Sequence, residues 1–478
     1  MKKRLFLLAP LALTGLIACG ENDVQEEEKT GTEIIMWHNS NDTTAALLGN
    51  FVTAFQDANP GITVKLSKET GDYNQILKAT LTGLTADNYP DLFLGYPDSV
   101  SQIMDYGKVV NLDKYMNDPE VGWTEDDFSD IPEAYIKEGQ NYQVEGTYSL
   151  PYAKSTEAMY YNKILIGLDL SAQDATINGG QPLTEAYINN LTWEELFGKL
   201  CPAIVAYNDS LDANAKIWLP NDKGYESIVS WSSDANAFIT LCEQYGYDYT
   251  KLDTNTGKGV PTFNNDNNKA LLKKFYEAHA KKYFTTYKAA GGSYTNTMFT
   301  KKQVLFDIGS TGGGQYYSGS NNTLVDFKIA KIPHAEGKAP KVINQGPSLA
   351  ILKHNDDRAL AAWKFYKFIT NPKNADAFAR TTGYSPIRYS VYETDDWAEY
   401  ASEEGKASKT LENTYAQIAN YVPKVANDLY SSPVFNGSAT CRTQVDGLMG
   451  NVLNMKSWSD DEANKFFESA YQTSLLAC

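Results

Sequence analysis

Residues 32–66 alternate between two hydrophobic patterns, and this alternation restricts the chain to a small set of folds. The stretch "TEIIMW" (Thr32–Trp37) is a run of β-type residues, and "ITVKL" (Ile62–Leu66) is a second one. Between them, "TTAALLGNFVTAFQDANP" places its large apolar residues on one helical face, and Pro60-Gly61 ends that helix. Two strands joined by an amphipathic helix within about 35 residues predict a βαβ unit with parallel strands. We therefore expect an α/β fold built on an open sheet.

Polar and aromatic residues follow the expected strands of this sheet. A helix expected over Tyr73–Ala86 leads through Pro90-Asp91 to the strand "LFLGY". In open parallel sheets, ligands bind at the carboxyl ends of the strands. Residues 37–39, 96–98 and 151–156 each follow a strand. These three loops are expected to form a ligand-binding edge.

The first 32 residues have the composition of an export signal followed by a tether. A basic head, Met1-Lys2-Lys3-Arg4, precedes an apolar run from Leu5 to Ile17. This run is shorter than the roughly 20 residues of a membrane span, but it suits a secretory signal. "LIAC" then resembles the lipobox of bacterial lipoproteins, in which the peptidase cuts before the cysteine and lipid is attached to its sulfur. We predict a signal peptide over 1–18, lipidation of Cys19, and a disordered acidic tether over 19–32. The alternative is an ordinary cleaved signal with an incidental cysteine.

Charge and composition exclude several classes of function. The net charge of −17 argues against nucleic acid, whose phosphates require a basic surface. The 4 histidines lie far apart without metal-ligand spacing, and no P-loop motif occurs. We expect no metal, no cofactor and no nucleic-acid partner. With 42% hydrophobic residues, the chain is globular and long enough for two or more domains.

Four cysteines remain after the predicted lipidation site, namely Cys201, Cys242, Cys441 and Cys478. None of them has the C-x-x-C spacing of zinc or redox sites. An even number in an exported chain permits disulfides, and Cys201–Cys242 with Cys441–Cys478 is the most local pairing. Free buried thiols are the alternative, and the sequence leaves both open.

Several blocks in a fixed order resemble one protein family. They include "YPDLFLGYPDSVSQIMDYGKVVNLDKYM", "YSLPYAKSTEAMYYNK", "LTWEELF", "VLFDIGS", "NQGPSLAILK" and "AAWKFYKFITNPKNADAFARTTGYSPIR". Together they resemble the extracellular solute-binding proteins of carbohydrate-type ABC importers, the group of the maltose-binding and glycerol-3-phosphate-binding proteins. The likeness spans most of Ile34 to Tyr389.

This resemblance implies an α/β, two-lobed periplasmic-binding-protein-like fold with a multi-strand hinge and a ligand cleft between the lobes. The N-terminal lobe would comprise 33–150 plus 342–384, and the C-terminal lobe 151–341 plus 385–478. The chain would cross between lobes near Leu150–Ala153, Ile332–Ile343 and Tyr384–Arg388.

The resemblance also implies a set of ligand-binding residues: His38, Asn39, Asp98, Ser155, Trp231, Ser310, Thr311, Gly346 and Tyr384. Carboxylates and amides suit sugar hydroxyls, which both donate and accept hydrogen bonds. Other roles remain open for some of them, since Trp231 and Tyr384 also suit a core. Asp98 would equally suit a helix N-terminus, and Ser155 a hinge hydrogen bond. Many sugar binders carry a tryptophan where this chain has Thr311-Gly312.

The function implied is capture of a mono- or oligosaccharide and its delivery to the subunits of an ABC permease. We expect a monomeric lipoprotein anchored to the cell membrane and facing its extracytoplasmic side. A glycerol-3-phosphate or glycerophosphodiester ligand is the alternative within the same importer type. A glycan-active enzyme would need a pair of carboxylates in a catalytic motif, and no such motif is recognisable. We therefore expect no enzymatic activity.

Replacing Cys19 by alanine should abolish lipid attachment, because the thiol is the acyl acceptor of the predicted lipobox. Cell fractionation with metabolic acyl labelling would show unlabelled protein that is released or unprocessed. A labelled, correctly cut Cys19→Ala protein in the membrane fraction would contradict the lipobox assignment.

Overall fold

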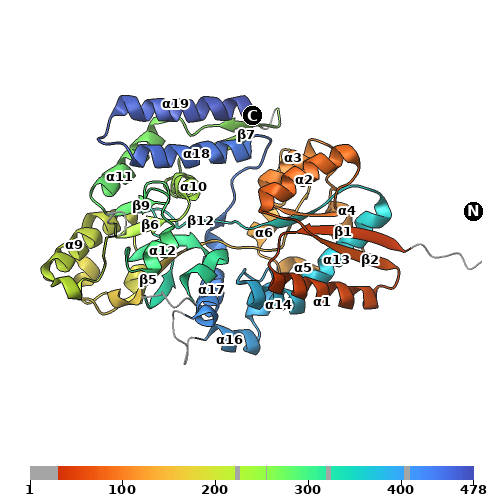
Figure 1. Cartoon of the computed structure of the whole chain (residues 1–478), viewed down its shortest axis with the longest axis horizontal. Helices are drawn as coiled ribbons and strands as arrows, with labels where there is room; N and C mark the ends of the chain where they lie inside the picture. The colour runs from red at the N-terminus through yellow and green to blue at the C-terminus, as the bar shows by residue number, and fades with distance from the viewer. Residues whose placement is uncertain (1–30, 221–226, 254–255, 319–324, 403–409) are drawn as a thin grey trace, which may run out of the picture.

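Two five-stranded sheets organise the chain, one in each of two lobes that lie side by side (Figure 1). The computed structural model describes residues 31–220, 227–253, 256–318, 325–402 and 410–478. The predicted signal peptide, Cys19 and nearly all of the predicted tether lie outside the described residues. No helix within the described ranges is long and apolar enough to cross a membrane.

The first sheet has the strand order β2-β1-β3-β13-β4. Its first part is formed by β1 (Thr32–His38), α1 (Asp42–Ala58), β2 (Ile62–Lys68), α2 (Tyr73–Ala86) and β3 (Leu92–Gly95). Strands β1 and β2 run parallel in register from Thr32 with Ile62 to His38 with Lys68. The predicted βαβ unit is therefore confirmed. The short helices that follow are α3 (Pro97–Met104), α4 (Asp113–Met116), α5 (Glu125–Ser129) and α6 (Glu133–Glu138).

Later segments of the chain complete the first lobe. Strands β4 (Leu150–Pro151) and β13 (Ser348–Ile351) join the sheet, and β13 runs antiparallel to both β3 and β4. Helices α13 (Asp356–Ile369) and α14 (Pro372–Thr382) cover its lower face together with α1 (Figure 1). Phe55 of α1 packs edge-on against Phe365 and Phe368 at centroid distances of 5.1 and 5.5 Å. Aromatic burial of this kind holds α1 to α13.

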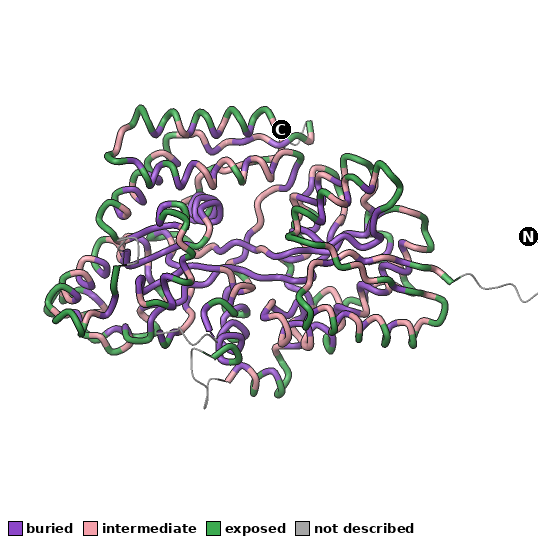
Figure 2. The backbone as a smooth tube through the Cα atoms, viewed as in Figure 1, coloured by how far each residue is buried: buried purple, intermediate pink, exposed green. Residues whose placement is uncertain are grey.

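The second sheet has the strand order β11-β5-β10-β6-β9. Its strands are β5 (Glu157–Asn162), β6 (Val229–Trp231), β9 (Phe284–Thr286), β10 (Phe306–Ser310) and β11 (Phe327–Ala330). The larger helices of the lobe that contains this sheet are α9 (Cys201–Ser210), α10 (Asp234–Tyr245), α11 (Asp266–Ala280), α17 (Leu411–Val425), α18 (Ser438–Leu453) and α19 (Asp460–Ala477). The smaller elements are α7 (Glu185–Asn189), α8 (Trp193–Glu195), α12 (Thr295–Thr300) and α16 (Asp395–Ala401). Two further strand pairs are β7 (Thr250–Asp253) with β8 (Lys258–Pro261), and β12 (Val342–Ile343) with β14 (Leu429–Tyr430). Helix α15 (Tyr389–Tyr392) lies against α14 of the first lobe. Buried backbone runs through both sheets and between them (Figure 2).

The segments that connect the lobes pair with one another. Residues 152–156 lead from β4 to β5, and residues 344–347 lead from β12 back to β13. Isolated bridges pair Ser155 with Gln345 and Lys154 with Ser385, and β12 runs parallel to β14. We propose that the chain crosses between the lobes in these paired segments, with Ser385 beside the first crossing and residues 344–347 as the return crossing.

The residues just after Ser385 contact the first lobe. Arg388 Nη1 donates to Asp127 Oδ1 of the first lobe at 3.0 Å, and Tyr389 N donates to Asp130 O at 2.7 Å. From these contacts we propose that the first lobe comprises 33–151 with 348–392, and the second 157–343 with 411–478.

A buried ion pair lies where the crossings meet. Lys154 Nζ bonds Glu138 Oε2 at the end of α6, and it also donates to Gly346 O at 3.1 Å. Glu138 accepts further from Ser348 Oγ and Asn344 Nδ2, each at 3.1 Å. Because both charges have hydrogen-bond partners besides each other, the pair meets the main condition for a tolerable buried charge.

A second buried carboxyl lies in the core of the second lobe. Asp307 of β10 accepts from Tyr317 Oη at 2.7 Å and from Ser230 Oγ at 2.8 Å. Tyr317 is stacked on Tyr160 with centroids 3.6 Å apart. Burial raises the pKa of Asp307 to about 7, although these hydrogen bonds oppose the rise. Between the ordinary pKa of an aspartate and about pH 7, this carboxyl is therefore protonated in the folded protein and ionised in the unfolded chain.

This difference predicts a pH-dependent stability. The folded pKa of Asp307 is above the unfolded value, so its contribution to stability is fully present near pH 4 and is lost as pH rises through about 7. The loss should be on the order of 4 kcal/mol. Asp307→Asn keeps partners for both hydroxyls and removes the titration. Denaturant unfolding at pH 5 and pH 8 should show a smaller fall for the variant than for wild type. Equal falls would contradict a raised pKa.

Candidate ligand-binding site

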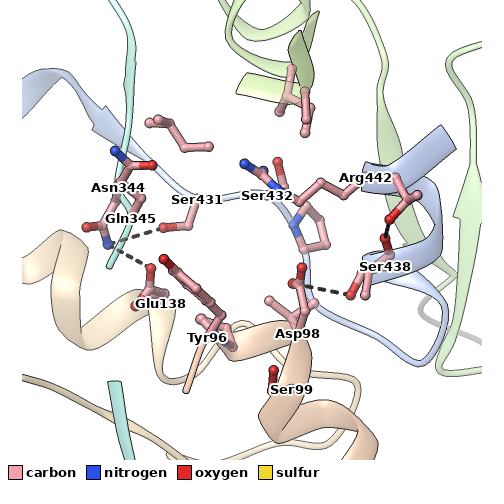
Figure 3. Close-up of a pocket in the computed structure, with 18 of the residues that line it drawn as sticks. Tyr96, Asp98, Ser99, Glu138, Asn344, Gln345, Ser431, Ser432, Ser438 and Arg442 are labelled. Atoms are coloured by element: carbon pink, nitrogen blue, oxygen red, sulfur yellow. Dashed lines mark hydrogen bonds between the residues drawn. The ribbon is translucent and has the colours of Figure 1, made fainter. Parts of the chain in front are cut away.

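A cavity of about 470 Å³ lies between the two lobes (Figure 3). The first lobe contributes the start of α3, including Tyr96 and Asp98. The second lobe contributes the start of α18 with Ser438 and Arg442. The crossings contribute Asn344, Gln345, Gly346 and the segment 431–434. The lining is therefore drawn from both lobes and from the hinge.

Asp98 forms the first-lobe wall from the first turn of α3, which Pro97 begins. Across the cavity, Ser438 Oγ donates to Asp98 Oδ1 at 3.4 Å. Burial raises the pKa of Asp98, while the charge of Arg442 and the Ser438 hydrogen bond lower it. Asp98 thus acts as the acidic residue of a helix N-terminus and also faces the opposite lobe.

Arg442 is held in the second-lobe wall by a chain of hydrogen bonds that becomes buried at Glu157. Its Nη2 donates to Asn236 Oδ1. Asn236 Nδ2 in turn donates to Glu157 Oε1 at 2.7 Å and to Gln345 Oε1 at 3.1 Å. Glu157 Oε2 accepts from Trp231 Nε1 at 3.1 Å. Among the described residues that line the cavity, Arg442 is the one cation.

Glu157, at the inner end of this chain, titrates near neutral pH. Burial raises its pKa to about 7, and the bonds from Asn236 and Trp231 and the charge of Arg442 act in the opposite direction. A buried carboxyl with several donors around it is an anchor that keeps Asn236 and Arg442 in one orientation.

The floor of the cavity requires a glycine. Gly346 has φ +99°, and a Cβ there would lie 2.1 Å from Ala153 O. No other residue fits this conformation without strain. The carbonyl of Gly346 accepts from Lys154, so the glycine joins the floor to the buried ion pair.

The structure separates the predicted site residues into groups. Asp98 and Gly346 line the cavity. Ser155, Thr311 and Tyr384 lie together around Gly312, whose Cβ would be 2.8 Å from Tyr384 Cε1 and 3.4 Å from Ser155 Cβ. Ser155 N donates to Gln345 O at 2.9 Å, and Thr311 Oγ1 accepts from Thr156 N at 3.1 Å. This second group packs at the hinge beside the cavity.

Three predicted residues lie elsewhere. His38 is buried at the end of β1, where its Nδ1 accepts from Ser40 N at 3.2 Å, and burial lowers its pKa. Asn39 Nδ2 donates to Gly71 O at 3.3 Å. Ser310 ends β10, and its carbonyl accepts from Tyr160 Oη at 3.4 Å. None of the three is among the residues that line the cavity.

The prediction that Trp231 stacks on a ligand is wrong. Its side chain is 0% exposed and stacks on Trp193, with ring centroids 5.8 Å apart. The small polar neighbours that suggested a cleft are themselves satisfied inside the fold, as Ser230 is by Asp307. Trp231 acts on the cavity only indirectly, through Glu157.

Sequence reasoning missed the second-lobe wall. Ser233, Asn236, Ser438 and Arg442 belong to the first turns of α10 and α18, which follow a short strand and an irregular segment. The sequence feature that could have indicated this wall is Arg442, a single arginine that follows Pro433 and Gly437. No cluster of metal-ligating side chains occurs in the part of the chain that the structure describes.

A ligand cavity enclosed between two α/β lobes and floored by their crossings defines a two-lobed binding protein. The chain belongs to the family of bacterial extracellular solute-binding proteins, whose family model matches residues 50–403. The family predicted from the ordered sequence blocks is confirmed.

Individual relatives agree with this assignment. The chain is 24% identical over 374 residues to the maltotriose-binding protein of Pyrococcus abyssi. The matched region covers 76% of this chain and 68% of the relative. The cyclic alpha-maltosyl-1,6-maltose binding protein of Arthrobacter globiformis is similar in fold, with TM-score 0.65, 18% identity, and coverage of 93% and 99%. UgpB of Mycobacterium tuberculosis, solved with glycerophosphocholine, has TM-score 0.66, 19% identity, and coverage of 94% and 98%.

Truncating Trp231 should destabilise the protein. Trp231→Ala leaves a core cavity and should cost about 3–5 kcal/mol of unfolding free energy. Trp231→Phe keeps most of the ring and removes the donor to Glu157, so we expect about 1–3 kcal/mol. Tyr316→Ala is the control, because Tyr316 is 62% exposed and should change stability by about 0.5 kcal/mol or less. Denaturant titration measures all three, and an unchanged midpoint for Trp231→Ala would contradict the core assignment.

Proposed function

We propose that the protein captures a carbohydrate between its lobes outside the cytoplasmic membrane and delivers it to an ABC permease. The observation that carries this proposal is the interlobe cavity, whose polar lining comes from both lobes and the hinge. Family membership supports capture of a solute. The relatives named for maltotriose and cyclic maltosyl-maltose support a sugar.

The lining has the chemistry that a sugar requires. Asp98, Asn344 and Gln345 offer carboxylate and amide groups that suit hydroxyls, which both donate and accept. Tyr96, 42% exposed, and Tyr249 add rings whose apolar faces suit the C–H faces of a sugar. The volume falls within the range of about 300–1,000 Å³ that is usual for small-molecule sites.

Closure of the lobes follows from where Asp98 and Arg442 lie. They belong to opposite lobes, so one ligand that contacts both binds the closed form better than an open one. A ligand shifts a conformational equilibrium only through such a difference in affinity. The closed, loaded form would be the one that the permease recognises.

The remaining features of the proposed function concern placement. Lipidation at Cys19 and the acidic segment that follows it would keep the binding lobes beside the permease, and the protein would act as a monomer. The motivation is the basic head, the apolar run and "LIAC".

A glycerophosphodiester is the second candidate ligand, and Arg442 favours it. A guanidinium suits phosphate geometry, and the similar fold of UgpB was solved with glycerophosphocholine. We expect no catalysis with either ligand, because the other carboxylates that line the cavity form ion pairs with lysines. Glu138 bonds Lys154, and Asp446 bonds Lys288 at 2.7 Å.

A thermal-shift and calorimetric screen should separate these ligands. Maltotriose, a monosaccharide such as glucose, and glycerophosphocholine are tested on one preparation. A true ligand at 100 times its Kd stabilises the fold by about 2.7 kcal/mol. We expect maltotriose to raise Tm and the phosphodiester to leave it unchanged.

Variants then place the binding in the cavity. Asp98→Asn should weaken sugar binding roughly 10-fold or more, because a charged hydrogen bond is worth about 1.5–3 kcal/mol. Lys465→Met, an exposed change on α19, is the control and should bind as wild type does. A shift with glycerophosphocholine that Arg442→Met abolishes would favour the second candidate. Hydrolysis of the tested glycans would contradict both.

A further inference from the structure

We propose that Cys441 and Cys478 form a disulfide in the exported protein, which joins the end of α19 to the first turns of α18. This inference goes beyond the proposed function and does not depend on which ligand is bound. Cys441 directly precedes Arg442 and lies one helical turn after Ser438. The proposed bond would therefore fix the helix that carries two residues of the cavity wall.

The two sulfur atoms already face one another. Cys441 Sγ and Cys478 Sγ lie 3.9 Å apart, although both thiols are free in the structure. A disulfide needs an S–S distance of about 2.05 Å, so the sulfurs must approach by roughly 2 Å. Rotation of the side chain at position 478 can supply such a movement, since this residue follows the last residue of α19.

Gly437 provides the space for this approach. It has φ +102°, and a Cβ there would lie 2.9 Å from Cys478 Sγ and 2.7 Å from Ala477 O. Any side chain at position 437 would push the end of α19 away from α18. The glycine thus accounts for the close contact between the two helices at this end.

The other two cysteines have a different environment. Cys201 and Cys242 are completely buried, and burial raises the pKa of both thiols far above the usual value. Cys242 Sγ donates to Asn268 Oδ1 at 3.2 Å. Thiols of this kind are chemically inert core residues. They serve as an internal reference for the proposed pair.

The oxidation proceeds by exchange with an external disulfide, either a thiol oxidoreductase or a small-molecule disulfide. Cys478 is the more exposed thiol; its thiolate attacks one sulfur of the oxidant, which forms a mixed disulfide and releases one oxidant thiol. The Cys441 thiolate then attacks Cys478 Sγ and releases the second oxidant thiol. The two protons from the cysteines end on the two oxidant thiols, so the oxidant gains two electrons and the protein loses two. Burial raises the pKa of Cys441 to about 12, so only a small fraction of this thiol is ionised and able to attack.

The bond would close a loop that contains most of α18 and the whole of α19. Cross-linking residues 37 positions apart restricts the unfolded chain, and this should raise Tm by on the order of 5–10 °C relative to the reduced protein. The bond also removes local opening of α19 from α18. The wall that carries Ser438 and Arg442 would then keep one position during lobe movement.

The test uses the full-length protein purified from the oxidising side of the membrane without reductant. Maleimide is added in denaturant before any reduction, and peptides are mapped by mass spectrometry. We expect labels on Cys201 and Cys242, and a linked peptide pair containing Cys441 and Cys478 that separates after reduction. Maleimide on Cys441 and Cys478 in the never-reduced protein would overturn the proposal.

Thermal unfolding gives an independent result that does not rely on labelling. Reductant should lower the Tm of wild type and leave the Tm of Cys478→Ser unchanged, because that variant has no bond to lose. The double variant Cys441→Ser/Cys478→Ser should respond as Cys478→Ser does. An equal Tm for wild type with and without reductant, or an equal effect of reductant on Cys478→Ser, would overturn the proposal.

Discussion

The buried ion pair between Lys154 and Glu138 is the constraint on which the arrangement of the two lobes depends. Glu138 ends α6 in the first lobe, Lys154 lies in the first crossing, and Gly346 and Asn344 of the return crossing bond to the same pair. Breaking such a pair leaves an uncompensated buried charge, at a cost of about 3–5 kcal/mol. The cavity floor therefore keeps its geometry because the crossings are tied to one another.

The cavity wall in the second lobe is rigid for a related reason. Arg442 is oriented by Asn236, and Asn236 by Glu157, whose other oxygen accepts from the core residue Trp231. A cationic side chain at the surface of the cavity is thus connected to the aromatic core by hydrogen bonds. Such networks specify one side-chain position, since every alternative leaves a buried group unpaired. The wall can present a preorganised group to a ligand at little further cost in entropy.

Much of the fold could be predicted from sequence, and the site only in part. The two β-type runs and the helical face between them in residues 32–66 predicted the βαβ unit, because the pattern of each element lies in consecutive residues. Asp98 and Gly346 were placed through the family resemblance, and both line the cavity. Trp231 was misplaced because its polar neighbours suggested an open loop, whereas Ser230 bonds Asp307 within the core. Arg442 was missed because its partners, Asn236 and Asp98, are distant in sequence.

The sequence by itself determined the α/β class, the family and the strand–helix order of residues 32–95. These properties depend on periodicity and ordered local motifs, both of which are present in the linear chain. Only the tertiary structure decided which residues face the cavity and that Cys441 lies beside Cys478. Those properties depend on contacts between segments separated by tens to hundreds of residues. Burial and orientation at such contacts arise from packing, and no local pattern specifies them.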